Sequence, residues 1–155
     1  MSAWLMKSEP EEFSIDDLVK APEQSVPWCG VRNYLARNFM RDHMKIGDEV
    51  LFYHSSCPEP GIAGLARVST PAYPDKTQWD KKGKYFDPKA TKENPRWMLV
   101  DVKLVKKTRL LSLAEMREQP SLADMVVLQR GNRLSITPVK PNELKAVLKL
   151  LGATF

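Results

Sequence analysis

Three segments with the residue pattern of β-strands constrain the fold of this chain more than any other feature. The clearest case is Arg96–Lys107 (RWMLVDVKLVKK), which alternates over much of its length and predicts a β-strand. Glu49–Ser55 and Ile62–Ser69 also predict strands, and a loop rich in proline separates them. Because these strands are interspersed with short helical segments, the sequence predicts an α+β domain built on a curled sheet.

Shorter elements complete this prediction. Ala3–Lys7 is typical of a strand that buries Trp4 and Met6, or else Leu5. One helix is predicted to start after Ser14, and another at Val31, with Val31, Tyr34 and Leu35 packing against the core. Further short helices are predicted at Ser112–Glu118, Leu122–Gln129 and Asn142–Leu151, and a strand at Arg133–Val139.

The segment Thr70–Pro95 is expected to be a long loop, because it is rich in proline and charge and has no clear period. A loop of this length inside a compact domain is usually functional or disordered. Its four aromatic residues, Tyr73, Trp79, Tyr85 and Phe86, argue against disorder. We therefore expect this loop to carry function.

Length and composition limit the class of protein. The 155 residues are read as one domain, 1–155, with 43% hydrophobic residues and a formal net charge of +5, which permits a nucleic-acid partner without requiring one. The N-terminus lacks the pattern of a signal peptide and no apolar run approaches the roughly 20 residues of a membrane span. Two cysteines, Cys29 and Cys57, fit a reduced compartment. We expect a cytoplasmic location, or a nuclear one in a eukaryote, and no membrane partner.

The segment Trp28–Asn38 (WCGVRNYLARN) combines side chains that suit nucleic acid. Trp28 lies between Pro27 and Gly30, a context that favours presenting its ring to a base. The amide of Asn33 is suited to read a base edge, and Arg32 and Arg37 to contact phosphates. Each has a plainer interpretation: core packing for the tryptophan, a backbone hydrogen bond for the asparagine, and a solvated helix face for the arginines.

Polar residues close two of the predicted strands. Lys7, Ser8 and Glu9 end the first, and Tyr53, His54 and Ser55 end the strand at Glu49–Ser55. Glu9 suits a contact with the amino group of a base, or an ion pair that orients Arg32. With two histidines in the chain and no C-x-x-C motif, neither a metal site nor a cofactor is expected.

Taken in order, the motifs resemble the EVE domain family. The matching pieces are Trp-Leu-x-Lys-Ser-Glu-Pro at Trp4–Pro10, Trp-x-Gly-Val-Arg-Asn-Tyr-x-Ala-Arg-Asn at Trp28–Asn38, and Phe-Tyr-His-Ser at Phe52–Ser55. Shorter matches follow at Ala72–Asp75, Tyr85–Pro88, Pro95–Trp97 and Arg133–Ser135. The resemblance covers nearly the whole chain. Cys29 departs from it, because many members carry Asp at that position.

The resemblance implies a PUA-like fold, a small curled β-barrel with flanking helices, related to the YTH domain. It also implies a reader of a modified base, such as methylated cytosine or adenine in DNA or RNA, that flips the base into an aromatic pocket. Trp28 would be one wall and the strand end at Phe52–Ser55 another. Trp79 is the preferred third wall, with Tyr85 or Phe86 as alternatives. The predicted ligand-binding residues are Lys7, Ser8, Glu9, Trp28, Asn33, Tyr53, His54, Ser55, Trp79 and Tyr85, and the predicted phosphate-binding residues are Arg32 and Arg37.

Two other functions compete with this one. The related ASCH domains suggest a hydrolase of modified nucleosides, in which Lys7, Glu9 and either Tyr53 or His54 act as general acid and base. A protein-interaction module that uses the Thr70–Pro95 loop is the third possibility.

Overall fold

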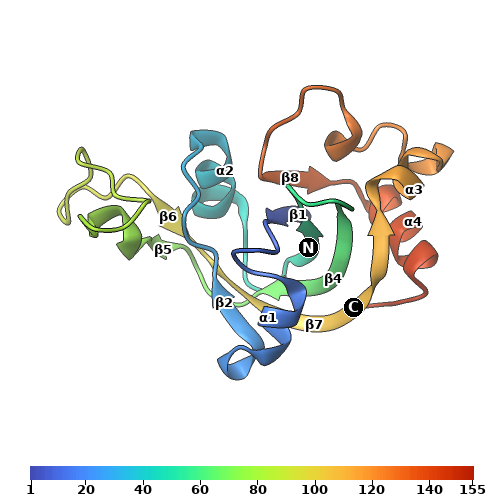
Figure 1. Ribbon diagram of the computed structural model, residues 1–155, viewed down its shortest axis with the longest axis horizontal. Helices are drawn as coiled ribbons and strands as arrows, with labels where there is room; N and C mark the ends of the chain where they lie inside the picture. The colour runs from blue at the N-terminus through green and yellow to red at the C-terminus, as the bar shows by residue number, and fades with distance from the viewer.

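A mixed six-stranded sheet forms the centre of the protein; the structure, a computed structural model, describes all residues from 1 to 155 (Figure 1). The strands lie in the order β2 (Ser25–Pro27), β7 (Asp101–Ser112), β4 (Gly61–Val68), β3 (Glu49–His54), β1 (Ala3–Ser8) and β8 (Ile136–Val139). β1 and β3 are parallel, and all other neighbouring strands are antiparallel. The α+β prediction is confirmed. The strands do not close into the expected barrel, because the short edge strands β2 and β8 each pair with one neighbour only.

Short helices flank this sheet. They are α1 (Ile15–Lys20), α2 (Tyr34–Asn38), α3 (Leu113–Arg117) and α4 (Pro141–Leu151), with a π-helix η2 (Phe39–His43) and the 3₁₀ turns η1 (Pro22–Gln24), η3 (Lys76–Trp79), η4 (Pro120–Leu122) and η5 (Val126–Leu128). Ser14 caps α1 as predicted, and its hydroxyl accepts the N–H of Asp17 at 3.1 Å. None of the helices has the length and apolar character that crossing a membrane needs.

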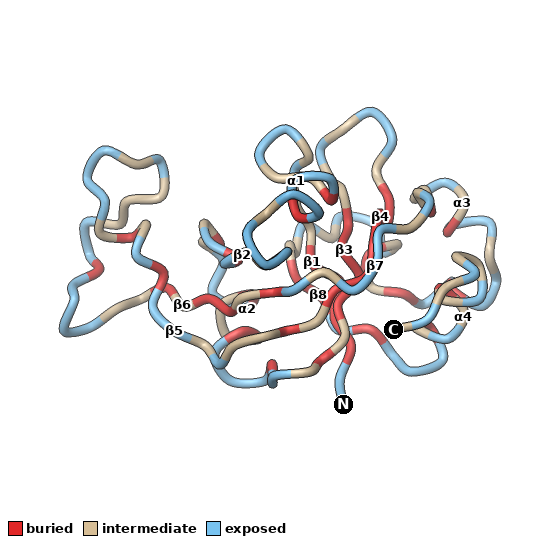
Figure 2. Tube along the Cα trace, turned by 90° about the horizontal axis from the view of Figure 1, so that it is seen from below, coloured by how far each residue is buried: buried red, intermediate tan, exposed pale blue.

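Both faces of the central strands are buried. Along β1, Trp4 and Met6 pack in a cluster with Leu18 of α1, whereas Leu5 packs in a second cluster with Val147 of α4. The alternation therefore places Leu5 in the core as well as Trp4 and Met6, because helices cover both sides of the sheet. Figure 2 shows this buried zone running through the strands, with exposed loops around it.

The second predicted helix begins later than expected. Val31 is buried but lies before the helix, and α2 starts only at Tyr34, with Asn33 as its N-cap. Tyr34 and Leu35 are each 46% exposed. The expectation that they pack in the core was wrong because the apolar spacing was counted from Val31, which lies outside the helix.

Two further segments differ from the prediction. Leu122–Gln129 forms no α-helix; it joins η4 to η5, and extended backbone at Met125 separates the two turns. The strand predicted at Arg96–Lys107 is divided into the two-residue β6 (Met98–Leu99) and the long β7, which extends to Ser112. In Figure 1, β7 curves around β4 and gives the sheet its curl.

The long loop is ordered around a buried glutamine. We call residues 73–97 the loop lobe; it contains β5 (Tyr73–Pro74) and η3 and projects from the sheet at the left of Figure 1. The fully buried side chain of Gln78 accepts the N–H groups of Arg96 and Trp97 at 2.9 and 3.0 Å and donates to the carbonyls of Asp75 and Trp97 at 2.7 and 2.9 Å. Four hydrogen bonds to the backbone hold the lobe in shape where an apolar core is small.

Candidate functional site

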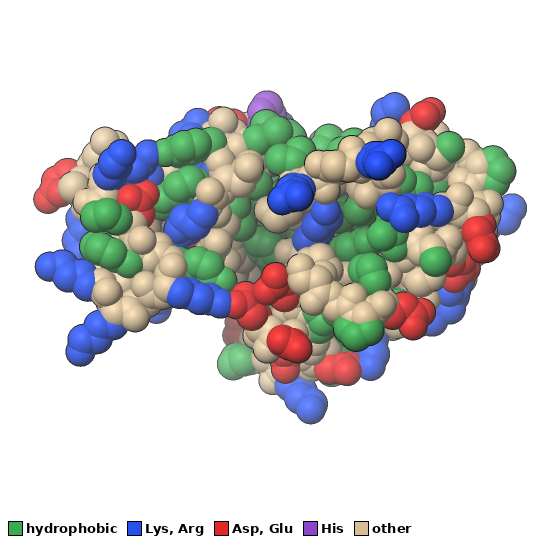
Figure 3. Space-filling model, turned by 45° about the horizontal axis from the view of Figure 1, so that its top comes forward, with side chains coloured by type: hydrophobic (Ala, Val, Ile, Leu, Met, Phe, Trp, Pro, Cys, Tyr) green, Lys and Arg blue, Asp and Glu red, His purple; other side chains and the backbone are tan.

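The main cavity of the protein lies between the loop lobe and the sheet. It encloses about 960 Å³, which is within the range of ligand pockets. Its walls come from segments far apart in the sequence: Lys7–Glu9, Glu12–Phe13, Val26–Arg32, Ser55–Ser56, Lys84–Tyr85, Arg133 and Ser135. Figure 3 shows the hollow between the loop lobe and the rest of the protein, with Lys and Arg side chains on its rim.

Trp28 forms the floor of this cavity. It is only 7% exposed, and its ring meets that of Phe52 edge to face with centroids 5.4 Å apart. Its backbone N–H donates to the carbonyl of Val100 at 3.0 Å. The indole therefore serves the core and the cavity together, because one part packs on Phe52 and a small part remains open.

Tyr85 forms the wall of the cavity on the side of the loop lobe, and Gly30 makes room for it. Gly30 has a φ of +83°, and a Cβ atom at this position would lie 2.6 Å from Cζ of Tyr85. The ring thus packs on the bare backbone of Gly30. Of the three aromatic residues considered for this wall, Tyr85 lines the cavity, whereas Trp79 and Phe86 do not. Trp79 lies in η3, and its buried indole N–H has no hydrogen-bond acceptor.

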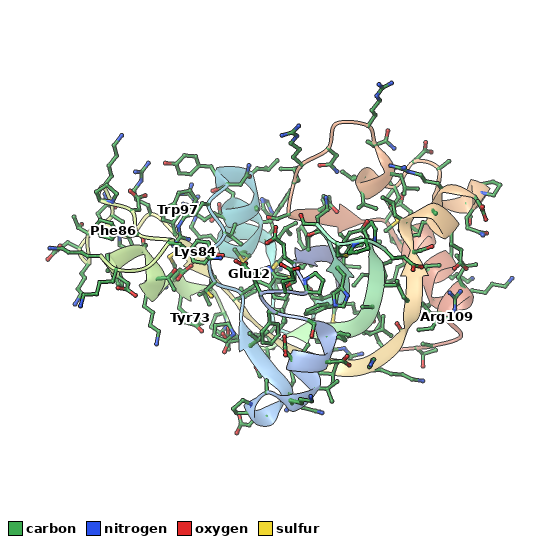
Figure 4. All side chains as sticks on the ribbon, viewed as in Figure 1. Glu12, Tyr73, Lys84, Phe86, Trp97 and Arg109 are labelled. Atoms are coloured by element: carbon green, nitrogen blue, oxygen red, sulfur yellow. The ribbon has the colours of Figure 1, made fainter.

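Glu12 ties the loop lobe to the sheet across the mouth of the cavity. Its carboxylate accepts the hydroxyl of Tyr85 at 3.2 Å and forms an ion pair with Lys84. The ammonium of Lys84 also lies 5.0 Å from the centre of the Tyr85 ring. Figure 4 shows Glu12 and Lys84 directed toward each other between the two parts.

Arg32 fastens the base of the loop lobe. Its guanidinium donates five hydrogen bonds: two to the carbonyl of Tyr85, one to that of Val31, one to the carboxylate of Asp75 and one to the hydroxyl of Thr77. All five N–H groups of an arginine are thereby used. A phosphate contact by Arg32 stays a prediction, but in this conformation none of its N–H groups is left to make that contact. The carboxylate that orients Arg32 is that of Asp75 rather than that of Glu9.

Asp75 is the acceptor on which this fastening converges. It is 1% exposed and accepts the N–H of Gly30 at 2.8 Å, the N–H of Thr77 at 2.9 Å and the Arg32 guanidinium at 3.2 Å. Burial alone would raise the pKa of Asp75, but the hydrogen bonds from Thr77, Gly30 and Arg32 outweigh it and lower the pKa below its ordinary value. The carboxylate is held in its charged form.

Asn33 and Arg37 lie outside the cavity. The side chain of Asn33 accepts the N–H of Ala36 at 3.0 Å, which is the backbone role named as its plainer interpretation. Arg37 donates to the carbonyl of Arg96 at 2.8 Å and lies 4.7 Å from the centre of the Tyr34 ring. Tyr34 in turn stacks on Trp97 at 4.9 Å, so these residues join α2 to the loop lobe. A base contact by Asn33 and a phosphate contact by Arg37 stay predictions.

The three residues of the strand end at Tyr53–Ser55 lie in different surroundings. Ser55 lines the cavity, whereas Tyr53 lines a neighbouring cleft, and burial raises the pKa of Tyr53 to about 12. His54 lies in neither: its Nε2 accepts the N–H of Ile15 at 3.0 Å, and burial lowers its pKa. A histidine whose ring nitrogen caps a helix is not free to act as the base of a hydrolase.

The first strand end does reach the cavity. The cavity is lined by Lys7, Ser8 and Glu9, although the hydroxyl of Ser8 already donates a hydrogen bond to the carbonyl of Phe13 at 2.6 Å. Cys29 also lines it, and burial raises the pKa of its thiol. No group of three or more His, Cys, Asp or Glu side chains is close enough together to hold a metal ion.

Residues 2–150 match the EVE domain. The chain belongs to the EVE domain family. Human thymocyte nuclear protein 1 is 46% identical over 167 residues, which cover 96% of this chain and 73% of the human protein. An uncharacterized protein of Schizosaccharomyces pombe is 40% identical over 95% of this chain and 67% of its own length.

Solved structures agree with this assignment. Human thymocyte nuclear protein 1 in complex with 5-methylcytosine-containing DNA has a TM-score of 0.92 at 44% identity and covers 100% of both chains. A hypothetical protein from Leishmania major has a TM-score of 0.92 at 49% identity, covering 98% of this chain and 95% of that one. An ASCH protein of Zymomonas mobilis, at 11% identity and a TM-score of 0.58 over 97% of this chain and 99% of that one, shares the fold alone. That likeness supports the PUA-like expectation.

The EVE domain site also contains residues that sequence reasoning missed. Glu12, Lys84 and Arg133 line the cavity, and Asp75 organises it from behind. Glu12 and Lys84 lie 72 positions apart in the chain, so no local pattern joins them. The matches at Ala72–Asp75 and Tyr85–Pro88 were the available signal, because they placed two family motifs inside a loop without periodicity.

Proposed function

We propose that this EVE domain binds a modified base of nucleic acid, with 5-methylcytosine in DNA as the first candidate, by taking the base out of its stack into the cavity above Trp28. The observation that carries the proposal is the human relative solved with 5-methylcytosine-containing DNA, which matches this chain over its full length. The aromatic floor and wall of the cavity supply a physical reason for the same ligand.

The energetics favour Tyr85 as the principal stacking partner. Extruding a base costs a few kcal/mol, and stacking on an aromatic side chain returns about 1–3 kcal/mol. Trp28 offers little free ring surface at 7% exposure, whereas Tyr85 is half-buried and faces the cavity. A methyl group that becomes buried adds about 1 kcal/mol, or about fivefold in affinity.

Glu9 is suited to read the edge of the base. It lines the cavity, is exposed and forms no ion pair. A carboxylate accepts a hydrogen bond from the exocyclic amino group of cytosine. Glu12, the other cavity carboxylate, is already paired with Lys84.

The loop lobe is suited to hold the phosphate backbone beside the cavity. Residues 75–96 contain seven Lys or Arg and four Asp or Glu. Lys81, Lys82 and Lys89 are exposed and form no ion pair, so their ammonium groups are free where the guanidinium of Arg32 is not. Binding that uses such contacts weakens as salt rises.

The test compares duplexes that differ in one methyl group. Binding of a labelled duplex with a single 5-methylcytosine, and of the same duplex with cytosine, is measured for the wild type, Tyr85→Ala and Tyr73→Ala. Tyr73 is the matched control, because it lies in the same lobe outside the cavity. We expect about a fivefold preference for the methylated duplex in the wild type. Tyr85→Ala should weaken that binding by about 5- to 150-fold, and Tyr73→Ala should leave it unchanged. Equal affinities for both duplexes would refute the proposal.

A further inference from the structure

A second cleft opens directly beside the main cavity. It encloses about 610 Å³ and shares Lys7, Ser55 and Ser56 with the main cavity. Its far side is formed by Leu113 and Arg117 around α3 and by the segment 127–132. The two spaces thus meet at the ends of β1 and β3, so a ligand in one can extend into the other.

The charge of this cleft is of one sign. Three of its lining residues are cationic, Lys7, Arg117 and Arg130, and none is Asp or Glu. None of the three takes part in an ion pair within the protein. Near the main cavity, Arg32 and Arg37 by contrast donate to protein acceptors.

Lys7 stands where the two spaces join. It pairs with Tyr53 in the sheet, and its ammonium lies 6.0 Å from the centre of that ring. Burial removes water from the ammonium group of Lys7 and lowers its pKa. No carboxylate forms an ion pair with this group in place of the water. An anion from outside the protein would supply the missing partner. Tyr53 lines the same cleft, and because burial raises its pKa to about 12 its hydroxyl remains neutral and able to donate.

We propose that Lys7 binds the phosphate of the extruded nucleotide and that the cleft with Arg117 and Arg130 holds the next nucleotide of the same strand. This inference rests on the proposed function, since it assigns the direction in which the strand leaves the base cavity. Both spaces fall within the size range of single ligand pockets, and they share a cation at their junction. The ligand class is therefore a base-flipped strand read over two nucleotides, rather than a free nucleoside.

The experiment separates the contribution of phosphate from that of the methyl group. Calorimetry measures the binding of 5-methyl-2′-deoxycytidine, its 5′- and 3′-monophosphates, and dinucleotides extended by thymidine on either side, each beside the unmethylated analogue. For the wild type we expect one monophosphate to bind at least about tenfold tighter than the nucleoside, and the dinucleotide extended on that side to bind tighter again.

Variants assign this gain to residues. Lys7→Met should reduce the ratio of nucleotide to nucleoside affinity to near one. Arg117→Gln, a surface change on α3, should remove the gain from nucleotide to dinucleotide while leaving nucleoside binding unchanged. With a single-stranded oligonucleotide, the slope of log affinity against log salt should fall by about 0.7 in each. Lys145→Met on α4, with the same loss of charge outside both spaces, is the control and should change none of these values.

Three results would overturn the inference: affinities for nucleoside, both monophosphates and both dinucleotides within twofold; equal loss in Lys7→Met and Lys145→Met; or Lys7-dependent binding of inorganic phosphate with no gain for nucleotides. Failure of the proposed function looks different. In that case methylated and unmethylated ligands bind equally, whatever the phosphate contributes.

Discussion

The contact between Gly30 and Tyr85 leads to a quantitative prediction for Gly30→Ala. The substituted residue would keep a φ of +83°, which costs an L-residue about 1–2 kcal/mol, and its Cβ would lie 2.6, 2.8 and 3.0 Å from three atoms of the Tyr85 ring. The ring must therefore move out of the cavity wall.

The displacement adds to the backbone cost. Tyr85 would lose its hydrogen bond to Glu12, worth about 0.5–1.5 kcal/mol, and its cation–π contact with Arg32 at 5.5 Å, worth about 0.5–1 kcal/mol. Gly152→Ala is the matched control, because Gly152 also has a positive φ, +62°, but nothing lies within 4 Å of an added Cβ. The free energy of unfolding should fall by about 1–2.5 kcal/mol more in Gly30→Ala than in Gly152→Ala. This corresponds to a difference in Tm of about 2–10 °C for a domain of this size.

The stability of both variants, each alone and each combined with Tyr85→Ala, is measured by chemical and thermal unfolding. If the excess arises from the clash, it disappears once Tyr85 is an alanine, since no ring remains to be displaced. Gly30→Ala should also weaken binding of the methylated duplex, and Gly152→Ala should not. The reasoning is refuted if Gly30→Ala destabilises no more than Gly152→Ala, or if its excess persists without the Tyr85 ring.

Three more predictions follow from the site. Trp28→Ala should lower the free energy of unfolding by about 3–5 kcal/mol, because the indole packs on Phe52. Trp28→Phe keeps an aromatic ring there and should lower it much less. Equal unfolding midpoints for Trp28→Ala and the wild type would place Trp28 outside the core. The lowered pKa of Asp75 contributes stability that is complete above about pH 3.9 and is lost as the pH falls through its lower folded pKa. Asp75→Asn should therefore be less stable at neutral pH and lose less stability in acid, a difference that pH-dependent denaturation detects; parallel curves would contradict it. The lowered pKa of His54 means that the unfolded chain takes up the proton more readily, so wild-type stability should fall as the pH drops below about 6.5. His54→Gln keeps an acceptor for Ile15 and should lose that dependence; a dependence of unchanged size would assign it elsewhere.

Elements set by neighbouring residues were predictable from the sequence. The strands at Ala3–Ser8, Glu49–His54 and Gly61–Val68 follow from short runs of apolar residues bounded by polar or turn residues, and Ser14 begins α1 through a capping box with Asp17, three positions later. The family motifs also marked Trp28, Lys7 and Glu9, which do line the cavity. Each of these signals is contained within a few residues of the chain.

The roles of the polar residues were not predictable in the same way. Arg32 and Asn33 have the composition of a nucleic-acid contact, yet one fastens the loop lobe and the other caps α2. Tyr34 has the spacing of a core residue but lies on the surface, stacked on Trp97. A donor or a ring finds its partner through space, and three partners of Arg32, namely Asp75, Thr77 and Tyr85, lie more than 40 positions away.

By itself, the sequence determined the α+β class, most of the strands, the capped start of α1 and the family, because alternation, caps and ordered motifs are local properties. Only the tertiary structure decided that the sheet stays open, that Tyr85 rather than Trp79 lines the cavity, and that Asp75 holds Gly30 and Arg32 behind it. These outcomes depend on which distant segments pack together. Packing decides them because a cavity wall and a buried ion pair exist only once both of their sides are in place.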